Sequence, residues 1–239
     1  MAFLELWASR RVRDVVAEVE TVGTYFFERF AAARALAVLA VLAELAASGA
    51  PARAETVRIL VLGDSLTAGY GLDLADTFPV RLERALRDEG LDVAVINAGV
   101  SGDTTAGGLA RLGWALADRP DIAIVALGGN DALRGLDPTT TRANLDAIVT
   151  RIEAAGVRVL LAGMKAPPNL GAEYGRAFEA VFAGIAERHG VAFYPFFLEG
   201  VAAVAALNQD DAIHPNARGI HIMVEGIVPY VRDLIADVD

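Results

Sequence analysis

The chain contains no cysteine and has few basic residues for its length of 239. Without a thiol, both a disulfide-stabilised fold and cysteine-based catalysis are excluded. The 21 Lys and Arg residues face 31 Asp and Glu residues, which leaves a formal net charge of −10. Because a nucleic-acid-binding protein needs a basic surface for the phosphates, we expect no nucleic-acid partner. The hydrophobic fraction of 54% excludes a disordered chain and indicates a globular protein.

Three common active-site motifs are also missing. No Gly-x-Gly-x-x-Gly loop follows the first predicted strand, and no Gly-x-x-x-x-Gly-Lys loop occurs, so the usual phosphate-binding loops are lacking. Serine is scarce after residue 54, where only Ser65 and Ser101 occur, and neither lies in a Gly-x-Ser-x-Gly elbow. The sequence therefore indicates no dinucleotide cofactor.

Long hydrophobic runs are concentrated in the N-terminal part. Residues 35–43 are all Ala, Leu or Val, Arg29 and Arg34 precede them, and an Ala-Arg-Ala string ends at residue 54. A basic flank, a short apolar core and a small-x-small ending are typical of a secretory signal peptide. We therefore predict that residues 1–54 form an N-terminal extension with a signal peptide cleaved after Ala54. The protein is then periplasmic or secreted.

A membrane anchor is the alternative if this segment is not cleaved. The uninterrupted apolar stretch is much shorter than the roughly 20 residues that span a bilayer, which makes the anchor the weaker interpretation. A signal peptide usually begins just before its basic flank, whereas this sequence begins roughly 30 residues earlier. Residues 1–30 are therefore interpreted as the result of a start site assigned too early. The segment 1–54 holds as many Arg as acidic residues, so the whole net charge belongs to residues 55–239.

Residues 55–239 alternate short β-branched runs with longer amphipathic stretches. Strands are predicted at 57–62, 93–96, 122–127, 157–161 and 191–194, and helices at 78–89, 105–116, 141–155, 174–189 and 215–235. The strands are apolar almost throughout, which is typical of a parallel sheet covered on both faces. The sequence predicts one α/β domain, a three-layer α/β/α sandwich with about five parallel strands. Ligands of such sheets bind at the carboxyl ends of the strands.

Ser65 directly follows the first predicted strand, in the string Gly63-Asp64-Ser65-Leu66. A serine presented on a strand-to-helix turn is suited to act as a nucleophile. A serine at this place can equally cap the turn or the following helix. Both interpretations stay open on this string alone.

A serine hydroxyl is a weak nucleophile and needs an adjacent base. His214 lies in a loop before the last predicted helix, three residues after Asp211. A carboxylate at this spacing can accept a hydrogen bond from the imidazole Nδ1–H, which fixes the tautomer and stabilises the imidazolium. Asp210 could compete for this place, but the spacing favours Asp211. A solvated loop pair is an alternative, whereas a metal site lacks an evident second histidine or carboxylate cage.

The two other histidines have ordinary structural explanations. His189 precedes Gly190 at a predicted helix end, where a cation satisfies the last carbonyl groups. His221 lies inside the last predicted helix and serves packing or the surface. Pro215 is expected in the first turn of that helix, where no partner is needed for the N–H that proline lacks.

Acyl transfer also needs hydrogen-bond donors for the developing oxyanion. Gly102 follows the second predicted strand and, having no side chain, can bring its N–H close to a substrate. Asn130 follows the third strand after two glycines, and its amide is a neutral donor suited to an oxyanion. Each could instead belong to a tight turn. Together, however, three successive strand ends carry Ser65, Gly102 and Asn130, and chance seldom produces that arrangement.

These residues resemble the four sequence blocks of the SGNH (GDSL) hydrolases. The matching blocks are Gly63-Asp64-Ser65-Leu66, Gly102, Gly128-Gly129-Asn130-Asp131 and Asp211-Ala212-Ile213-His214. Longer strings are similar to one branch, the bacterial periplasmic multifunctional acyl-CoA thioesterases that are also described as lysophospholipases and arylesterases. These strings are residues 63–71, 101–104, 107–112, 127–135, 195–197 and 210–216. The similarity covers nearly all of residues 55–239.

The resemblance implies a fold and a role for each candidate residue. The family fold is a three-layer α/β/α, flavodoxin-like domain with a five-stranded parallel sheet. Ser65 would be the nucleophile, His214 the general base and acid, and Asp211 the residue that orients the histidine. The backbone N–H groups of Ser65 and Gly102 and the side chain of Asn130 would form the oxyanion hole.

The implied activity is hydrolysis of carboxylic esters or thioesters through an acyl-Ser65 intermediate. The implied substrates are small acyl molecules, namely aryl esters, acyl-CoA and lysophospholipids. No metal and no cofactor are implied, and we expect a monomer with transient contact to membrane lipid. Residues 164–169, after the fourth strand, depart from the branch, so a preference for acyl-chain length does not carry over.

Three other functions stay open on the sequence alone. A carbohydrate acetylesterase of the same superfamily would need a polar groove, which the Leu, Pro and Phe residues near the predicted site disfavour. An acyltransferase would need an acceptor that outcompetes water. A catalytically inactive binding module would lack a member of the triad, and none is lacking.

Overall fold

The computed structural model describes residues 56–238. The predicted signal peptide, its cleavage after Ala54 and the start of the enzyme domain at residue 55 lie outside the described residues and stay predictions. Within residues 56–238, no helix combines the length and the apolar character that crossing a membrane requires.

A parallel sheet of five strands forms the centre of the described part. The strands are β1 (Val57–Gly63), β2 (Val93–Gly99), β3 (Ile122–Ala126), β4 (Arg158–Ala162) and β5 (Ala192–Tyr194). They lie in the order β2-β1-β3-β4-β5, and all neighbouring strands are parallel. The predicted fold class is confirmed. The chain changes direction across the sheet between β1 and β3, the place at which doubly wound sheets bind their ligands.

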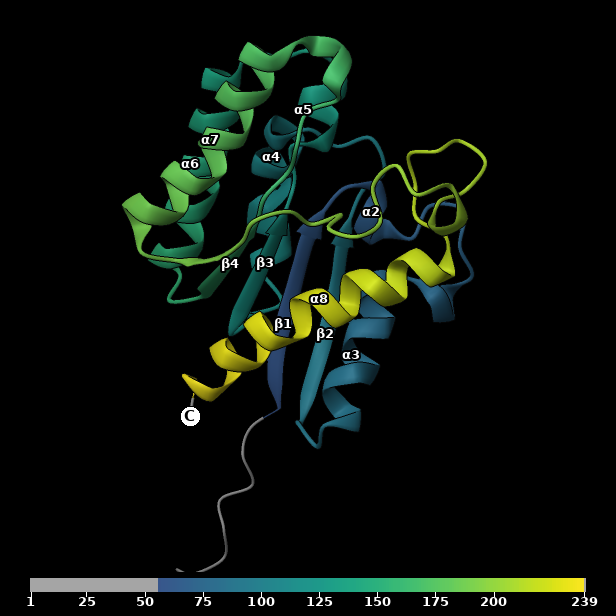
Figure 1. Cartoon of the computed structure of the whole chain (residues 1–239). Helices are drawn as coiled ribbons and strands as arrows, with labels where there is room; N and C mark the ends of the chain where they lie inside the picture. Colours follow the sequence, from purple (N-terminus) through teal and green to yellow (C-terminus); the bar gives the residue numbers. More distant parts are fainter. Residues whose placement is uncertain (1–55, 239) are drawn as a thin grey trace, which may run out of the picture. The chain divides into compact units, whose positions relative to one another are not determined.

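Helices cover both faces of the sheet. They are α2 (Ser65–Ala68), α3 (Phe78–Asp88), α4 (Thr105–Leu116), α5 (Gly129–Leu133), α6 (Pro138–Ala154), α7 (Ala172–His189) and α8 (Ala217–Ala236), with 3₁₀ turns at Leu74–Asp76, Pro168–Leu170 and Ala205–Leu207. Helices α3 and α8 pack together on one face, and α4, α6 and α7 pack together on the other (Figure 1). These are the two outer layers of the predicted sandwich.

The sheet is buried because its strands carry few polar side chains. All of β3 is buried, and in β1 only Arg58 is exposed. Phe78 of α3 meets Phe197 edge to face at 5.0 Å, and Phe178 meets Phe182 of α7 in the same way at 5.4 Å. Each fully buried aromatic side chain contributes roughly 1.5–3 kcal/mol of hydrophobic stabilisation. The packed layers therefore give the strand ends a rigid support.

Strands β2, β1 and β3 end at the same level. Gly63, the last residue of β1, is in register with Gly99 of β2 and Ala126 of β3. The loops that follow these strands therefore start side by side at one edge of the sheet. In Figure 1 this edge lies near α2 and α5. Residues from three separate stretches of sequence meet there.

The start of the last helix differs from the sequence prediction. The predicted helix includes Pro215 in its first turn, but α8 begins at Ala217. Asn216 caps the helix, because its Oδ1 accepts hydrogen bonds from the N–H groups of Arg218 and Gly219 at 3.0 and 3.2 Å. Pro215 instead forms an isolated antiparallel bridge with Asn208. The prediction for Pro215 is wrong because the cap lies one residue after the proline.

The other differences concern helix starts and short segments. Helix α6 begins at Pro138 rather than at residue 141, because Asp137 accepts a hydrogen bond from the Thr139 N–H at 2.8 Å and caps the helix. Strand β2 continues past residue 96 to Gly99. Helices α2 and α5 have no predicted counterpart, since four and five residues are too few to show a helical period.

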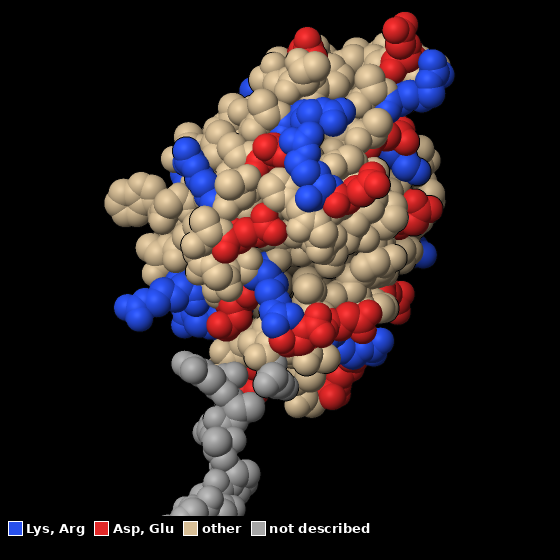
Figure 2. Space-filling view, turned by 90° about the vertical axis from the view of Figure 1, so that its left-hand side faces the viewer, with Lys and Arg blue, Asp and Glu red and all other residues tan. Residues whose placement is uncertain are grey.

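Charged side chains of both signs are interspersed on the face shown in Figure 2. Ion pairs join the outer helices α6 and α7: Arg188 lies 2.9 Å from Asp146. His189 lies 3.1 Å from Asp146 and 2.7 Å from Glu153. These contacts hold the end of α7 against α6.

Candidate active site

Ser65 is the first residue of the short helix α2, directly after the end of β1. Asp64 caps this helix, because its Oδ1 accepts a hydrogen bond from the Leu66 N–H at 3.0 Å. The Asp64 carbonyl also accepts from the Ala68 N–H at 2.9 Å. The Ser65 hydroxyl therefore does not serve as the cap that was its alternative interpretation, and it faces a cavity.

The Ser65 hydroxyl is hydrogen-bonded to His214, which comes from the loop before α8. Ser65 Oγ lies 2.9 Å from His214 Nε2, and His214 Nδ1 lies 2.7 Å from Asp211 Oδ2. The second carboxylate oxygen, Oδ1, accepts from the N–H groups of Ile213 and His214, both at 2.9 Å. Asp211 thus holds both the ring and the backbone of His214. The structure pairs the histidine with Asp211 and not with Asp210.

The same hydrogen bonds keep the Asp211 carboxyl ionised. The His214 N–H lowers its pKa most, the His214 ring and the Ile213 N–H add to this, and the pKa falls from 3.8 to about 2. A carboxylate in this position stabilises the imidazolium that forms when the histidine accepts a proton. The geometry therefore allows His214 to remove the Ser65 proton.

Gly102 and Asn130 line the same cavity as Ser65. Gly102 has a φ of +83°, a conformation that glycine adopts without steric strain. Within residues 56–238, the backbone N–H groups of Ser65 and Gly102 donate to no protein acceptor. Two unoccupied donors and a side-chain amide thus lie at one site, as stabilisation of an oxyanion requires.

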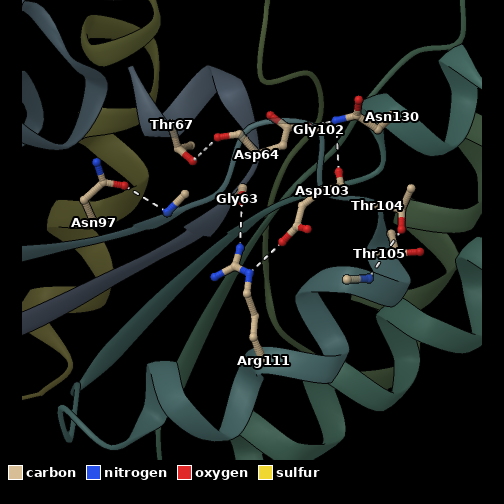
Figure 3. Close-up of polar contacts among 12 residues, drawn as sticks. Gly63, Asp64, Thr67, Asn97, Gly102, Asp103, Thr104, Thr105, Arg111 and Asn130 are labelled. Atoms are coloured by element: carbon tan, nitrogen blue, oxygen red, sulfur yellow. Dashed lines mark hydrogen bonds and ion pairs between the residues drawn. The ribbon is translucent and has the colours of Figure 1, made fainter. Parts of the chain in front are cut away.

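The Asn130 amide is held by residues from two other loops. Nδ2 donates to the backbone carbonyl of Asp103 at 2.9 Å and to Asp64 Oδ2 at 3.2 Å (Figure 3). The neighbouring Asp131 is fully buried and accepts from the Thr105 N–H and hydroxyl at 2.8 and 2.5 Å. Asp131 anchors α5 to the start of α4, so the amide has a defined position.

Asp64 is a residue for which the sequence alone indicates no role. The residue is only 2% exposed. Burial raises its pKa from 3.8 to about 6, although hydrogen bonds from the Leu66 N–H and the Asn130 amide act in the opposite direction. Its place beside Ser65 was visible in the sequence, but its burial depends on loops far away along the chain.

Tyr70 is a second residue that sequence reasoning misses. Its ring lies against the His214 imidazole, with ring centroids 4.5 Å apart and a tilt of 36°. Gln209 donates from Nε2 to the carbonyls of Tyr70 and Pro215 at 2.8 and 3.0 Å. These contacts hold the histidine loop against the segment after α2. The only sequence signal for Tyr70 is its place in the string of residues 63–71.

The site opens into a cavity of about 820 Å³. Ser65, Asn130 and His214 provide polar lining, whereas most of the remaining lining is apolar and includes Leu133, Met164, Pro167, Phe196, Leu198 and Ile213. A concave apolar surface with a few convergent polar groups is typical of a small-molecule site. The size and lining suit an acyl chain whose carbonyl carbon lies at Ser65.

The two other histidines lie outside this site. Burial lowers the pKa of His189, but hydrogen bonds to Asp146 and Glu153 outweigh burial and raise it above 6.5. The histidine therefore pairs with carboxylates of α6 rather than capping its own helix, which Gly190 ends in a left-handed conformation. His221 is exposed and lies 3.3 Å from Glu225. In the described part of the chain, no three His, Asp or Glu side chains converge to hold a metal ion.

Known proteins resemble this chain in both sequence and fold. The model of the GDSL-like lipase/acylhydrolase family matches residues 61–222. Esterase TesA of Pseudomonas aeruginosa is 42% identical over 74% of this chain and 89% of its own. An Escherichia coli protein named thioesterase 1/protease 1/lysophospholipase L1 is 40% identical over 74% of this chain and 84% of its own. The crystal structure of AlinE4, an SGNH-hydrolase family esterase, is 46% identical, with a TM-score of 0.65, over 76% of this chain and 98% of its own.

Proposed function

This chain is a serine esterase of the GDSL-like lipase/acylhydrolase family, the SGNH hydrolases, and we propose that it cleaves carboxylic esters and thioesters of apolar acyl groups. The reaction proceeds through an acyl-Ser65 intermediate. The observation that carries the proposal is the hydrogen-bonded chain from Ser65 Oγ through His214 to Asp211, at 2.9 and 2.7 Å. This chain opens into an apolar cavity, so a nucleophile and a place for an acyl group coincide.

In the first half of the reaction, Ser65 Oγ forms a bond to the carbonyl carbon while His214 Nε2 takes its proton. The carbonyl oxygen becomes negatively charged and accepts hydrogen bonds from the Ser65 and Gly102 N–H groups and the Asn130 amide. His214 then gives its proton to the leaving oxygen or sulfur, and the bond to that atom breaks. An alcohol or thiol leaves, and the acyl group remains on Ser65.

In the second half, a water molecule gives a proton to His214 and forms a bond to the acyl carbon. The same donors bind the second oxyanion. His214 returns the proton to Ser65 Oγ, and the bond between Ser65 and the acyl carbon breaks. A carboxylic acid leaves, and the enzyme is restored. Asp211 stabilises the imidazolium in both halves.

The lining of the cavity supports apolar acyl groups as the preferred substrates. Met164 is almost fully buried at the cavity, and Leu133 and Ile213 are half-exposed beside it. The similar proteins are named esterase and thioesterase/lysophospholipase, which fits acyl esters and thioesters with several kinds of leaving group. A carbohydrate acetylesterase would require a more polar lining than this cavity has.

The decisive experiment compares the two serines that line the cavity, Ser65 and Ser101. Ser65→Ala should lower kcat on p-nitrophenyl butyrate by on the order of 10⁴-fold or more, because the nucleophile is lost. Ser101→Ala is the matched control and should stay within twofold of wild type. A fluorophosphonate should label Ser65 only, as read by peptide mass spectrometry. Undiminished turnover by Ser65→Ala would disprove the proposal.

We also propose that the enzyme is exported, with residues 1–54 removed. The proposal rests on the basic flank, the apolar run of residues 35–43 and the Ala-Arg-Ala ending. N-terminal sequencing of the protein recovered outside the cytoplasm should give Glu55 as its first residue. A mature protein that retains the run of residues 35–43 would instead indicate a membrane anchor.

A further inference from the structure

We propose that Arg111 is a positioning residue that sets the spacing between the oxyanion donors of the site. This inference rests on the proposed function, because it assigns the backbone N–H groups of Ser65 and Gly102 and the Asn130 amide to one oxyanion. Arg111 lies on α4 and does not line the cavity. It therefore acts through other residues and not on the substrate.

The Arg111 guanidinium joins the end of β1 to the loop after β2. Nη2 donates to the Gly63 carbonyl at 2.9 Å, and Nε donates to Asp103 Oδ2 at 2.6 Å (Figure 3). Gly63 lies two residues before Ser65, and Asp103 directly follows Gly102. The two backbone donors are thus each within two residues of an atom that Arg111 holds.

Asp103 extends this connection to the third donor. Its carbonyl accepts the hydrogen bond from Asn130 Nδ2 at 2.9 Å, and its N–H donates to the Val100 carbonyl at 3.1 Å. The Val100 N–H in turn donates to the Gly63 carbonyl at 3.1 Å. All three donors are therefore connected through Asp103 and Gly63, and among residues 56–238 Arg111 is the one side chain that binds both.

Arginine has the geometry that this role requires. Its planar guanidinium presents several N–H groups in fixed directions, whereas a lysine has one compact ammonium group. The side chains of Arg111 and Asp103 are only 23% and 18% exposed, so water competes less with these bonds than at the surface. A displacement of reacting groups by about 1 Å can lower the reaction rate by on the order of 10²-fold. A fixed spacing between the oxyanion donors therefore affects catalysis directly.

The test is Arg111→Gln, with Arg87→Gln as the matched control. Arg87 on α3 makes the same kind of contacts away from the site: Nε and Nη2 donate to the Val93 carbonyl at 3.0 and 2.8 Å, and Nη1 pairs with Glu83 at 2.7 Å. Arg111→Gln should lower kcat on p-nitrophenyl butyrate by about 10- to 100-fold, with KM within twofold. Arg87→Gln should lower the melting temperature but leave kcat within twofold.

Two further readouts separate positioning from a general loss of structure. Rates are expressed per active site titrated with a fluorophosphonate, so unfolded protein does not count. A trifluoromethyl ketone, which forms a tetrahedral oxyanion on the serine, should lose affinity for Arg111→Gln in proportion to kcat/KM. Asp103→Asn should show a similar loss in kcat, and the double variant should be no worse than the single variants, because both remove one shared contact.

Each outcome decides the inference. A kcat per active site that Arg111→Gln leaves unchanged would overturn it, as would losses that are fully additive with those of Asp103→Asn. If Ser65→Ala retains activity, the proposed function itself fails. If Ser65→Ala is inactive and Arg111→Gln is as active as wild type, only the positioning role fails.

Discussion

At the scale of single residues, the site depends on groups whose charge or direction is set by their neighbours. Asn130 shows this clearly, because its Nδ2 already donates to the Asp103 carbonyl and to Asp64. In the proposed reaction, the oxyanion would bind an amide that these contacts have already oriented. Such preorganised donors act on the transition state without reorganisation at the moment of reaction.

Removing the Asn130 donor should slow the chemical step. Asn130→Ala is expected to lower kcat by on the order of 10²–10³, with little change in KM. Asn144→Ala is the control, since Asn144 donates to Thr105 at 3.0 Å and does not line the cavity. Steady-state kinetics on a p-nitrophenyl ester measure both variants. An unchanged kcat for Asn130→Ala would remove this residue from the oxyanion hole.

Asp211 and Asp210 offer a comparison between adjacent carboxylates. Asp211→Asn should lose most of its activity, because the amide no longer enforces the tautomer of His214. Asp210→Asn should keep the activity of wild type, since its carboxylate does not contact the ring. Equal losses in the two variants would contradict the pairing seen in the structure. The Asp211 pKa of about 2 means that its stabilising contribution is present above about pH 4 and is lost only in stronger acid.

The contribution of Asp64 to stability depends on pH in the opposite direction. Its pKa is about 6 in the folded protein and 3.8 as its ordinary value, so the folded protein holds a proton that the unfolded chain has released between about pH 4 and pH 6. Wild-type stability therefore decreases as the pH rises through this window. The free energy of unfolding of Asp64→Asn, relative to wild type, should increase by about 2 kcal/mol from pH 4 to pH 7.

Urea unfolding at several pH values measures the difference in stability between Asp64→Asn and wild type. If the substitution also changes stability by a constant amount at every pH, the dependence of this difference on pH stays the same. Asp73→Asn, which removes an exposed carboxylate, is the control and should show no such trend. If the difference between Asp64→Asn and wild type does not vary with pH, Asp64 is not the buried carboxyl described.

At the scale of elements, the turn between β3 and α5 decides where Asn130 lies. Gly128 has a φ of +113°, and an added Cβ would lie 2.9 Å from the Phe182 ring. Gly128→Ala should therefore destabilise the protein by about 1–3 kcal/mol and also lower kcat. Gly113→Ala in α4 is the control, because an added Cβ meets nothing within 4 Å and alanine favours a helix by about 1 kcal/mol. Thermal unfolding should shift in opposite directions for the two variants.

The contact between α6 and α7 should depend on the ionisation of His189. Its pKa is raised by the carboxylates of Asp146 and Glu153, against the effect of burial. A raised histidine pKa contributes stability that is fully present below about pH 6.5 and is lost as the pH rises through the folded value. His189→Gln should thus destabilise the protein more at pH 5.5 than at pH 8.5. Melting temperatures at the two pH values test this, and His221→Gln, which changes an exposed side chain of α8, is the control.

At the scale of the whole molecule, the net charge of −10 lies entirely on residues 55–239. The negative charges of the protein repel a highly anionic substrate, and salt shortens the range of this repulsion. We expect kcat/KM for an acyl-CoA to rise between 10 mM and 200 mM NaCl, whereas kcat/KM for an uncharged p-nitrophenyl ester of the same acyl length stays constant. Equal salt effects on both substrates would show that the field of the protein does not act on the substrate.

Local sequence determines much of the fold and many of the candidate groups. Apolar β-branched runs must be buried on both faces, so the parallel sheet and its helical layers are readable from their pattern. Gly63 to Leu66, Gly102, Asn130 and the Asp211–His214 pair stand out because each carries unusual chemistry at the end of a predicted element. Short helices such as α2 lack a readable period, and the caps Asp137 and Asn216 act through side-chain contacts that a period does not show.

The order of the strands is what the pattern leaves open. Because β1 lies between β2 and β3, the segments that carry Gly102 and Asn130 start on either side of the one that carries Ser65. His214 reaches Ser65 from 149 residues away. The burial that raises the Asp64 pKa and the contacts of Arg111 with Gly63 and Asp103 arise only when these loops meet. Residue types and local periods therefore define the fold class and the candidate groups. The distances between these groups, their charges and the hydrogen bonds that hold them are properties of long-range packing. They depend on segments that are neighbours in space and not in sequence.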